Sequence, residues 1–309
     1  ELDKRVATII LRKAATNPRV YLLVLNLLNA FIAMWISNVT SSTIVITLVG
    51  PTIMQLSRES NYAKAMLFSI AAGGNLAGAM TPLSSPQNAV TIDATKGLVN
   101  LDFVGFFATA TPFAIICCLV CWGVAQLWYP IDVERVPMVP DVKTDFGWRQ
   151  IYVTIVSLVT IALWIALKLG LEPIFSDYGI IALIPIIMFY GAGILSPTQV
   201  SELPWNVLFL LMGGNALAKI VKESGLVDVI TQLMQSFLSG KSVWLTCLII
   251  NLCTLVIDFF TTHTVSSMIT MPIIAAFAET SPQLGVYSMM ACVATSCSMI
   301  LPVSSFPNM

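Results

Sequence analysis

The chain contains 309 residues, of which 57% are hydrophobic and 10% are charged, and its formal net charge is −1. Because soluble domains carry about 25% charged residues, this composition excludes a soluble globular domain and indicates an all-α protein that crosses a membrane several times. The near-neutral charge also argues against a nucleic-acid partner.

Residues 1–17 are predicted to form an interfacial amphipathic helix, in which basic side chains lie among apolar ones. Apolar runs at 20–36 and 43–56 follow, and a polar segment separates them. Each run is near or below the ~20 residues that a membrane span needs. We therefore predict a re-entrant hairpin with its tip at Ser37–Ser42.

The next apolar segment is interrupted by a polar, proline-containing loop at Thr81–Asn88, with arms at 63–80 and 89–101. We predict one broken transmembrane helix here, followed by an uninterrupted span at 103–128. Residues 18–128 form a first repeat on this interpretation.

Residues 129–149 contain three prolines and much of the mid-chain charge, which is typical of a linker. We assign residues 150–309 to a second repeat. Its predicted parts are spans at 151–169 and 178–194, an apolar helix at 206–218, a hairpin broken at Thr261–Ser267, and a broken helix with its loop at Pro302–Asn308. The first loop continues into an apolar half-helix and the second does not. We therefore expect the last half-helix of the second repeat to be missing and the chain to be truncated at its C-terminus.

Two pairs of matching segments indicate an internal duplication. Residues 82–88 read PLSSPQN and residues 302–308 read PVSSFPN, while the hairpin tips read SNVTSS at 37–42 and THTVSS at 262–267. The basic residues gather on the side of the membrane that holds the N-terminal helix, which predicts that the repeats are inverted relative to each other. Inverted repeats with re-entrant hairpins and broken helices are typical of transporters that work by alternating access.

The four polar breaks also predict an anion site. Each break exposes the N-terminus of a half-helix, where unpaired N–H groups and the helix dipole favour negative charge. Hydroxyl groups in the breaks donate further hydrogen bonds, and free carbonyl and amide oxygens suit Na⁺. His263, the single histidine, lies at the second tip and either donates to the anion or carries a proton. Asp258 either serves this site or bonds to nearby helix ends.

The sequence contains no recognisable enzyme motif. It has no His-Glu-x-x-His or Gly-x-Ser-x-Gly segment, and no second histidine for a metal or a triad. Its seven cysteines lie in apolar runs, which predicts small buried side chains rather than disulfides or a metal site. We therefore expect neither catalytic residues nor a cofactor, with Na⁺ or H⁺ as a possible coupling ion.

Three segments resemble the divalent anion:sodium symporters: MWISN at 34–38, SSPQN at 84–88 and WNVLFLLMGG at 205–214. Val39 replaces a threonine of that family's first tip, and Thr262-His263-Thr264 replaces its second Ser-Asn-Thr. These changes make the chain more similar to the SPX-type low-affinity phosphate transporters of eukaryotes. The resemblance implies an elevator-type homodimer that carries inorganic phosphate, with coupled cations, across the plasma membrane or a vacuolar-type membrane.

The resemblance and the polar chemistry of the breaks together predict two sets of ligands. The anion ligands are Asn38, Thr40, Ser85, Asn88, His263, Thr264, Ser305 and Asn308. The Na⁺ ligands are Ser37, Asn38, Ser84, Thr262 and Ser304. A sulfate or di/tricarboxylate:sodium symporter of the same fold is the first alternative, and a passive anion channel or a non-transporting sensor is the second.

Overall fold

The computed structural model describes residues 2–99, 101–137, 147–167, 170–176, 178–201, 223–238, 240–279 and 281–308, together with positions 205, 208, 209, 212, 213, 216, 219 and 220. Within these residues every regular element is a helix, which confirms the all-α prediction. Three of the described helices are long and apolar enough to cross a membrane alone: α6 (Phe103–Trp128), α7 (Trp148–Ala166) and α13 (Val243–Phe260).

The helices of the two halves follow each other in a similar order. The first half contains α1 (Leu2–Ala14), α2 (Pro18–Ala33), α3 (Asn38–Met54), α4 (Asn61–Ala77), α5 (Pro86–Ala94) and α6. The second contains α7, α8 (Glu172–Phe175), α9 (Tyr178–Gly191), α10 (Pro197–Ser201), α12 (Leu226–Leu238), α13, α14 (His263–Phe277), α15 (Leu284–Cys297) and the 3-10 helices η2 (Pro302–Ser304) and η3 (Phe306–Asn308). In the first half, α2 and α3 are joined by a short polar break and are followed by α4, which ends at a polar loop. In the second half, α13, α14 and α15 follow the same order.

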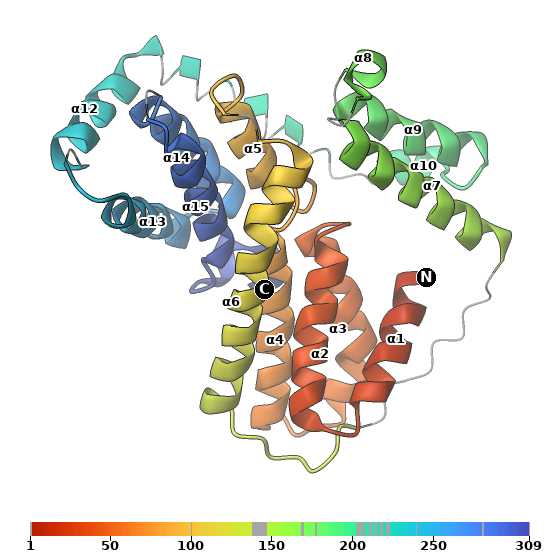
Figure 1. Ribbon diagram of the computed structural model, residues 1–309. Helices are drawn as coiled ribbons and strands as arrows, with labels where there is room; N and C mark the ends of the chain where they lie inside the picture. Colours follow the sequence, from red (N-terminus) through yellow and green to blue (C-terminus); the bar gives the residue numbers. More distant parts are fainter. Residues whose placement is uncertain are drawn as a thin grey trace.

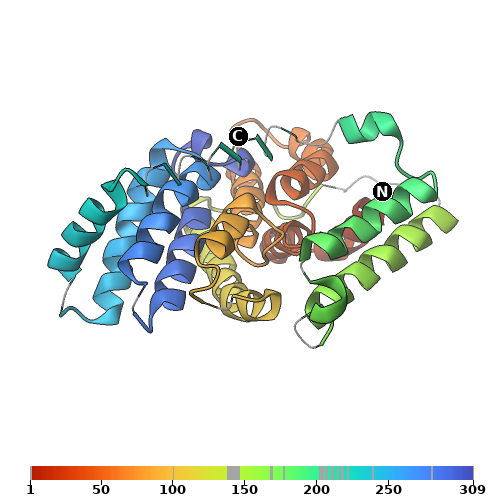
Figure 2. The same cartoon turned by 90° about the horizontal axis from the view of Figure 1, so that it is seen from above.

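The helices form three groups in space (Figures 1 and 2). α1 to α4 and α6 stand side by side, α12 to α15 form a second bundle, and α7 to α10 lie on the opposite side of the first group. α5 belongs to the first half in sequence but packs on α14 and α15 of the second. The polar breaks therefore lie where the first two groups meet.

α2 and α4 run parallel at the centre of the first group. Tyr62, near the start of α4, donates its hydroxyl hydrogen bond to the carbonyl oxygen of Pro18 at the start of α2 (3.0 Å). Beyond the other ends of these helices, Thr81 Oγ1 donates to the carbonyl oxygen of Met34 (2.6 Å). The intervening α3 therefore reverses the chain direction, as a hairpin with both arms on one side of the membrane requires.

A glycine allows the backbones of α2 and α4 to touch. A Cβ atom at Gly73 would lie 2.3 Å from the carbonyl oxygen of Asn26, closer than two such atoms approach in proteins. Small residues at helix contacts are a common means of close packing in membranes, where hydrophobic burial does not drive association. Fully buried Tyr21, Leu22 and Leu25, which precede Asn26 on α2, fill the core of this group.

The segment after α6 ties the first group together. Asp132 accepts hydrogen bonds from Ser60 Oγ (3.0 Å) and from the backbone N–H groups of Asn61 (2.9 Å) and Tyr62 (3.1 Å). It thus caps the N-terminus of α4 from a distant part of the chain. Desolvation opposes ionisation of this carboxyl group, but the hydrogen bonds outweigh it and hold the pKa of Asp132 below its ordinary value.

The hairpin tips are shorter than predicted. The first break spans residues 34–37, so it begins three residues before the predicted Ser37–Ser42 and shares only Ser37 with it. The break expected at Thr261–Ser267 covers only residues 261–262. Ser37 and Thr262 occupy the N-cap positions, where Ser and Thr are favoured because their side chains can accept from the first turn. The remaining polar residues therefore form the first turns of α3 and α14.

The predicted spans agree with the helices where the structure describes them. The span at 103–128 coincides with α6, and those at 151–169 and 178–194 correspond to α7 and α9. The helix expected at 206–218 lies mostly outside the described residues, as does the middle of the predicted linker, 138–146. α12, which packs mainly on α14, was not expected from the sequence.

Candidate functional site

The first loop, defined here as residues 78–88 and including the first turn of α5, contacts the hairpins of both halves. The backbone N–H of Asn38, the first residue of α3, donates to the carbonyl oxygen of Ser84 in this loop (3.3 Å). From the second half, Ser267 Oγ on α14 donates to the carbonyl oxygen of Gln87 at the start of α5 (3.2 Å). The first loop is thereby held between a hairpin of its own half and a hairpin 180 residues away.

The second loop, defined here as residues 298–308, also contacts the hairpins of both halves. Nε2 of His263, at the start of α14, lies 3.0 Å from the carbonyl oxygen of Ser298. On the side of the first half, a Cβ atom at Gly74 of α4 would lie 2.2 Å from Ser42 Oγ and 3.4 Å from Pro307 Cβ. Hairpin and loop of opposite halves thus pack around this glycine, and all four breaks meet in one region.

The two loops have the same internal hydrogen bonds. Ser84 Oγ lies 2.9 and 2.8 Å from the carbonyl oxygens six and three residues before it, and Ser304 Oγ lies 3.1 and 2.8 Å from those six and three residues before it. Asn88 Nδ2 lies 3.2 Å from Ser84 Oγ, and Asn308 Nδ2 lies 3.1 Å from Ser304 Oγ. The sequence match between residues 82–88 and 302–308 therefore extends to the conformation of the loops.

Ser85 and Ser305 occupy equivalent places in the two loops. Their backbone angles are nearly identical, with φ −158° and ψ 147° at Ser85 and φ −155° and ψ 147° at Ser305. Both side chains are buried, and each residue directly precedes a helical segment, α5 or η3. Ser85 forms no side-chain cap on α5, and its hydroxyl donates to Gln87 Oε1 instead. These two hydroxyls are presented equivalently by the duplicated backbone.

The predicted anion ligands differ in exposure. They are buried at Asn38, Ser85, Asn88, His263 and Ser305, half-buried at Thr264 and Asn308, and exposed at Thr40. Asn88 uses both amide hydrogens inside its own loop, at 2.7 Å from the carbonyl oxygen of Gly78 and 2.6 Å from that of Thr81. The sequence indicated neither the exposure of Thr40 nor the occupied amide hydrogens of Asn88.

The predicted Na⁺ ligands of the first half lie close together. Ser37 is the N-cap of α3, and the next residue, Asn38, is hydrogen-bonded to the backbone of Ser84. In the second half Thr262 is exposed and accepts from a backbone N–H of its own helix, whereas Ser304 is buried within its loop. Among the described residues no hydrogen bond joins these two.

His263 contacts the carboxylate of Asp258. Nε2 of the histidine lies 3.4 Å from Oδ2 of the aspartate, and both side chains are buried. Neither carboxylate oxygen has a hydrogen bond of normal geometry within the described residues. A buried carboxylate is stabilised either by an adjacent imidazolium or by protonation, and in both cases the pair is electrically neutral. The corresponding tip in the first half carries Asn38 and no ionisable group.

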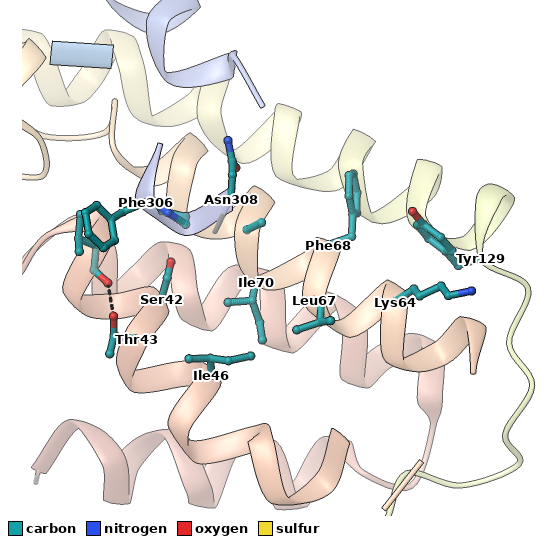
Figure 3. Close-up of a pocket in the computed structure, with 13 residues that line it drawn as sticks. Ser42, Thr43, Ile46, Lys64, Leu67, Phe68, Ile70, Tyr129, Phe306 and Asn308 are labelled. Atoms are coloured by element: carbon teal, nitrogen blue, oxygen red, sulfur yellow. Dashed lines mark hydrogen bonds between the residues drawn. The ribbon is translucent and has the colours of Figure 1, made fainter. Parts of the chain in front are cut away.

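A cavity of about 640 Å³ borders the site on the side of α3 and α4 (Figure 3). Ser42 of α3 and Asn308 of η3 lie at one end, beside Phe306, and Lys64 and Tyr129 lie at the other. The walls between them are largely apolar. The cavity therefore joins the polar breaks to a region with one positive charge.

The equivalent space in the second half is filled. Thr43 and Ile46 line the cavity on α3, and their counterparts on α14 are Met268 and Met271. These two methionines share a hydrophobic cluster with Val90 of α5. α5 thus covers the site on the α14 side.

The arrangement is suited to binding an anion without a lysine or arginine side chain. α3, α5 and α14 all begin in this region, and helix N-termini attract anions through free N–H groups and the helix dipole. Residues 34–42, 78–88, 261–267 and 298–308 contain no Lys, Arg, Asp or Glu. Hydroxyl and backbone N–H donors therefore supply the polar chemistry of the site.

Comparisons with known proteins agree with a transporter. A family model described as a citrate transporter (CitMHS) matches residues 1–296. The inorganic phosphate transporter PHO87 of Saccharomyces cerevisiae is 33% identical over 308 residues, which cover 99% of this chain and 33% of that protein. The low-affinity phosphate transporter PHO90 of the same yeast is 32% identical over 298 residues, which cover 96% of this chain and 34% of that protein.

A more distant relative transports a different anion. The sodium-dependent low-affinity dicarboxylate transporter 1 of Caenorhabditis elegans is 23% identical over 401 residues, which cover all of this chain and 68% of that protein. The chain spans about one third of the length of the yeast relatives. The family and these relatives are transporters and not enzymes, as predicted.

Proposed function

The chain belongs to the citrate transporter family (CitMHS), and from that premise we propose that its protein is a secondary active carrier of inorganic phosphate. The observation that carries the proposal is the meeting of the two duplicated loops with both hairpin tips, in a region of hydroxyl and backbone donors. A small, doubly charged anion is bound well by several converging N–H and O–H groups at helix N-termini.

Phosphate is preferred to a dicarboxylate for two reasons. Two relatives with about one third identity are named as phosphate transporters, whereas the named dicarboxylate transporter is 23% identical. In addition, Val39 stands at a hairpin tip where the dicarboxylate pattern has a threonine, so one hydroxyl donor is absent. The proposed phosphate contacts are Ser85 and Ser305 from the loops, with Asn38, His263 and Thr264 from the tips.

A cation is the proposed co-substrate. Side-chain and backbone oxygens of Ser37, Asn38 and Ser84 form a compact set, and hard oxygen ligands suit Na⁺. In the second half the neutral Asp258–His263 pair stands close to the corresponding position, so a second cation there is either Na⁺ or a proton. A cation beside the anion lowers the charge that must cross the membrane. We propose that a homodimer moves this site between the two faces by an elevator-type motion.

The test is phosphate counterflow with the full-length protein in proteoliposomes. We expect Ser85→Ala combined with Ser305→Ala to abolish exchange, because both loops lose the hydroxyl that we propose contacts the anion. For this contact the Ser85 hydroxyl must turn away from Gln87 Oε1, to which it donates in this structure. The matched control is Ser69→Ala combined with Ser288→Ala, which also removes one buried hydroxyl from each half but lies in α4 and α15, outside the breaks. This control is expected to exchange phosphate normally.

Each alternative predicts a different result. Normal exchange by the Ser85→Ala, Ser305→Ala variant would overturn the assignment of the site. Stronger competition by succinate or sulfate than by unlabelled phosphate would identify a dicarboxylate or sulfate symporter. Uptake that is not accelerated by phosphate on the opposite side would indicate a passive channel, and binding without uptake would indicate a sensor.

A further inference from the structure

The side chain of Asn88 has no hydrogen-bond donor left for an anion. It is fully buried, and its two amide hydrogens face the carbonyl oxygens of Gly78 (2.7 Å) and Thr81 (2.6 Å). Its Oδ1 accepts from Sγ of Cys292 on α15 (3.2 Å). Because two carbonyl oxygens require the nitrogen on their side, the carboxamide can adopt only this orientation.

Asn308 in the second loop is engaged in the same way. Its Nδ2 donates to Ser304 Oγ (3.1 Å) and to the carbonyl oxygen of Leu301 (3.3 Å). Its Oδ1 accepts from Nδ2 of Asn75 on α4, at 2.6 Å. The carboxamide oxygen of Asn75 itself is buried and has no hydrogen-bond partner among the described residues. Leaving a buried acceptor unpaired is unfavourable. Asn75 therefore acts here through its amide nitrogen, which donates, and not through its oxygen.

Each loop asparagine accepts a hydrogen bond from a donor in the opposite half of the chain. Asn75 belongs to the first half and holds the asparagine of the second loop, whereas Cys292 belongs to the second half and holds the asparagine of the first. They lie on α4 and α15, which are the equivalent helices that lead into the two loops. Each loop is thus fixed by its own asparagine and by one donor from the opposite half.

We infer that Asn75 and Cys292 are positioning residues for the anion site, and that Asn88 and Asn308 shape the loops instead of binding the anion. The inference rests on the proposed function, because the loops matter for transport only if they hold the substrate. The carboxamides set the backbone of each loop, and the loop then presents Ser85 or Ser305. Since a thiol is a weaker donor than an amide, Asn88 receives the weaker of the two hydrogen bonds from the opposite half.

Phosphate exchange by the full-length protein in proteoliposomes tests the inference through KM and the maximal rate. Cys292→Ala is expected to raise KM about fivefold and to change the maximal rate less than twofold, because one orienting hydrogen bond is lost. Cys292→Ser restores a donor and is expected to return KM to the wild-type value or below it. Asn75→Leu, which removes a stronger donor at similar volume, is expected to raise KM about tenfold.

The matched control is Cys118, a fully buried thiol on α6. Cys118→Ala and Cys118→Ser are expected to have the same KM. The inference is overturned if Cys292→Ser behaves like Cys292→Ala, or if neither Cys292→Ala nor Asn75→Leu raises KM in an active protein. Absence of phosphate exchange in the wild type would instead overturn the proposed function.

A second measurement does not depend on transport. Hydrogen exchange of the backbone amides in residues 78–88, without phosphate, reports how firmly the first loop is held. Cys292→Ala is expected to accelerate this exchange at least threefold, and Cys292→Ser to reverse the effect. Equal exchange in the wild type and Cys292→Ala would show that the thiol does not position the loop.

Discussion

Replacing Gly73 by alanine tests the close contact between α2 and α4. The new Cβ atom would lie 2.3 Å from the carbonyl oxygen of Asn26 and 3.1 Å from its carbonyl carbon. Both are backbone atoms and cannot rotate away. To reach a normal C···O distance of about 3.3 Å, the two helices must separate by about 1 Å.

The expected effect is a net destabilisation of about 2 kcal/mol. A gap of this size forfeits roughly a quarter to a half of the dispersion attraction at the contact. Overpacking of this kind costs about 1–3 kcal/mol, and we take the upper end because backbone meets backbone. The higher helix propensity of alanine returns about 1 kcal/mol. For 309 residues the entropy of unfolding is about 0.65 kcal/mol/K, so the midpoint of thermal unfolding should fall by roughly 3 °C.

Thermal unfolding of the detergent-solubilised full-length protein, followed by tryptophan fluorescence, is the assay. Gly50→Ala and Gly123→Ala are the matched controls, since both glycines lie within helices and a Cβ atom added at either would meet no neighbouring group of the described residues within 4 Å. They should leave the midpoint unchanged or raise it slightly. If Gly73→Ala unfolds at or above the temperature of these controls, the tight packing of α2 on α4 is refuted.

Three further predictions follow from single contacts. Gly74→Ala places a Cβ 2.2 Å from Ser42 Oγ, a side chain that can move, so phosphate exchange should fall about tenfold while the unfolding midpoint falls less than in Gly73→Ala. Equal exchange in Gly74→Ala and wild type would contradict this. Tyr62→Phe leaves the buried carbonyl of Pro18 without its 3.0 Å hydrogen bond and should lower the free energy of unfolding by about 1 kcal/mol, measured by the same melting assay. The pKa of Asp132 is lowered in the folded protein, so its stabilisation is present above the ordinary value of about 3.9 and is lost as the pH falls through the lower folded value. Asp132→Asn should therefore lower the midpoint at pH 7 and make it less sensitive to acid below pH 4; identical pH profiles would contradict the capping role.

The sequence predicted the positions of the breaks better than their lengths. Residues 37–42 and 262–267 are polar interruptions in apolar runs, and the structure does break the chain there. Polarity alone does not distinguish a loop from the first turn of a helix, because Ser, Thr and Asn satisfy helix N-termini as well as turns. The predicted tips therefore include the first five residues of α3 and of α14.

The surroundings of Asn88 could not be predicted from the sequence. Its neighbours Gly78 and Thr81 are local, but the donor to its Oδ1 is Cys292, 204 residues away. Seen in the sequence, Cys292 is one of seven similar cysteines in apolar runs. α12 could not be predicted for a different reason: a helix of 13 residues is too short to be recognised as a membrane span.

The crossed contacts have a consequence for biosynthesis. The bonds from Ser267 to Gln87 and from Asn75 to Asn308 join residues 180 and 233 positions apart. At translation rates of about 5–20 residues per second, the first loop enters the membrane roughly 10–45 s before its partners exist. During that interval polar groups of Asn75 and Gln87 lack their native partners, and water or other proteins must satisfy them. A variant that delays insertion of the second half would therefore expose the first half to quality control, even if every residue of the finished site were intact.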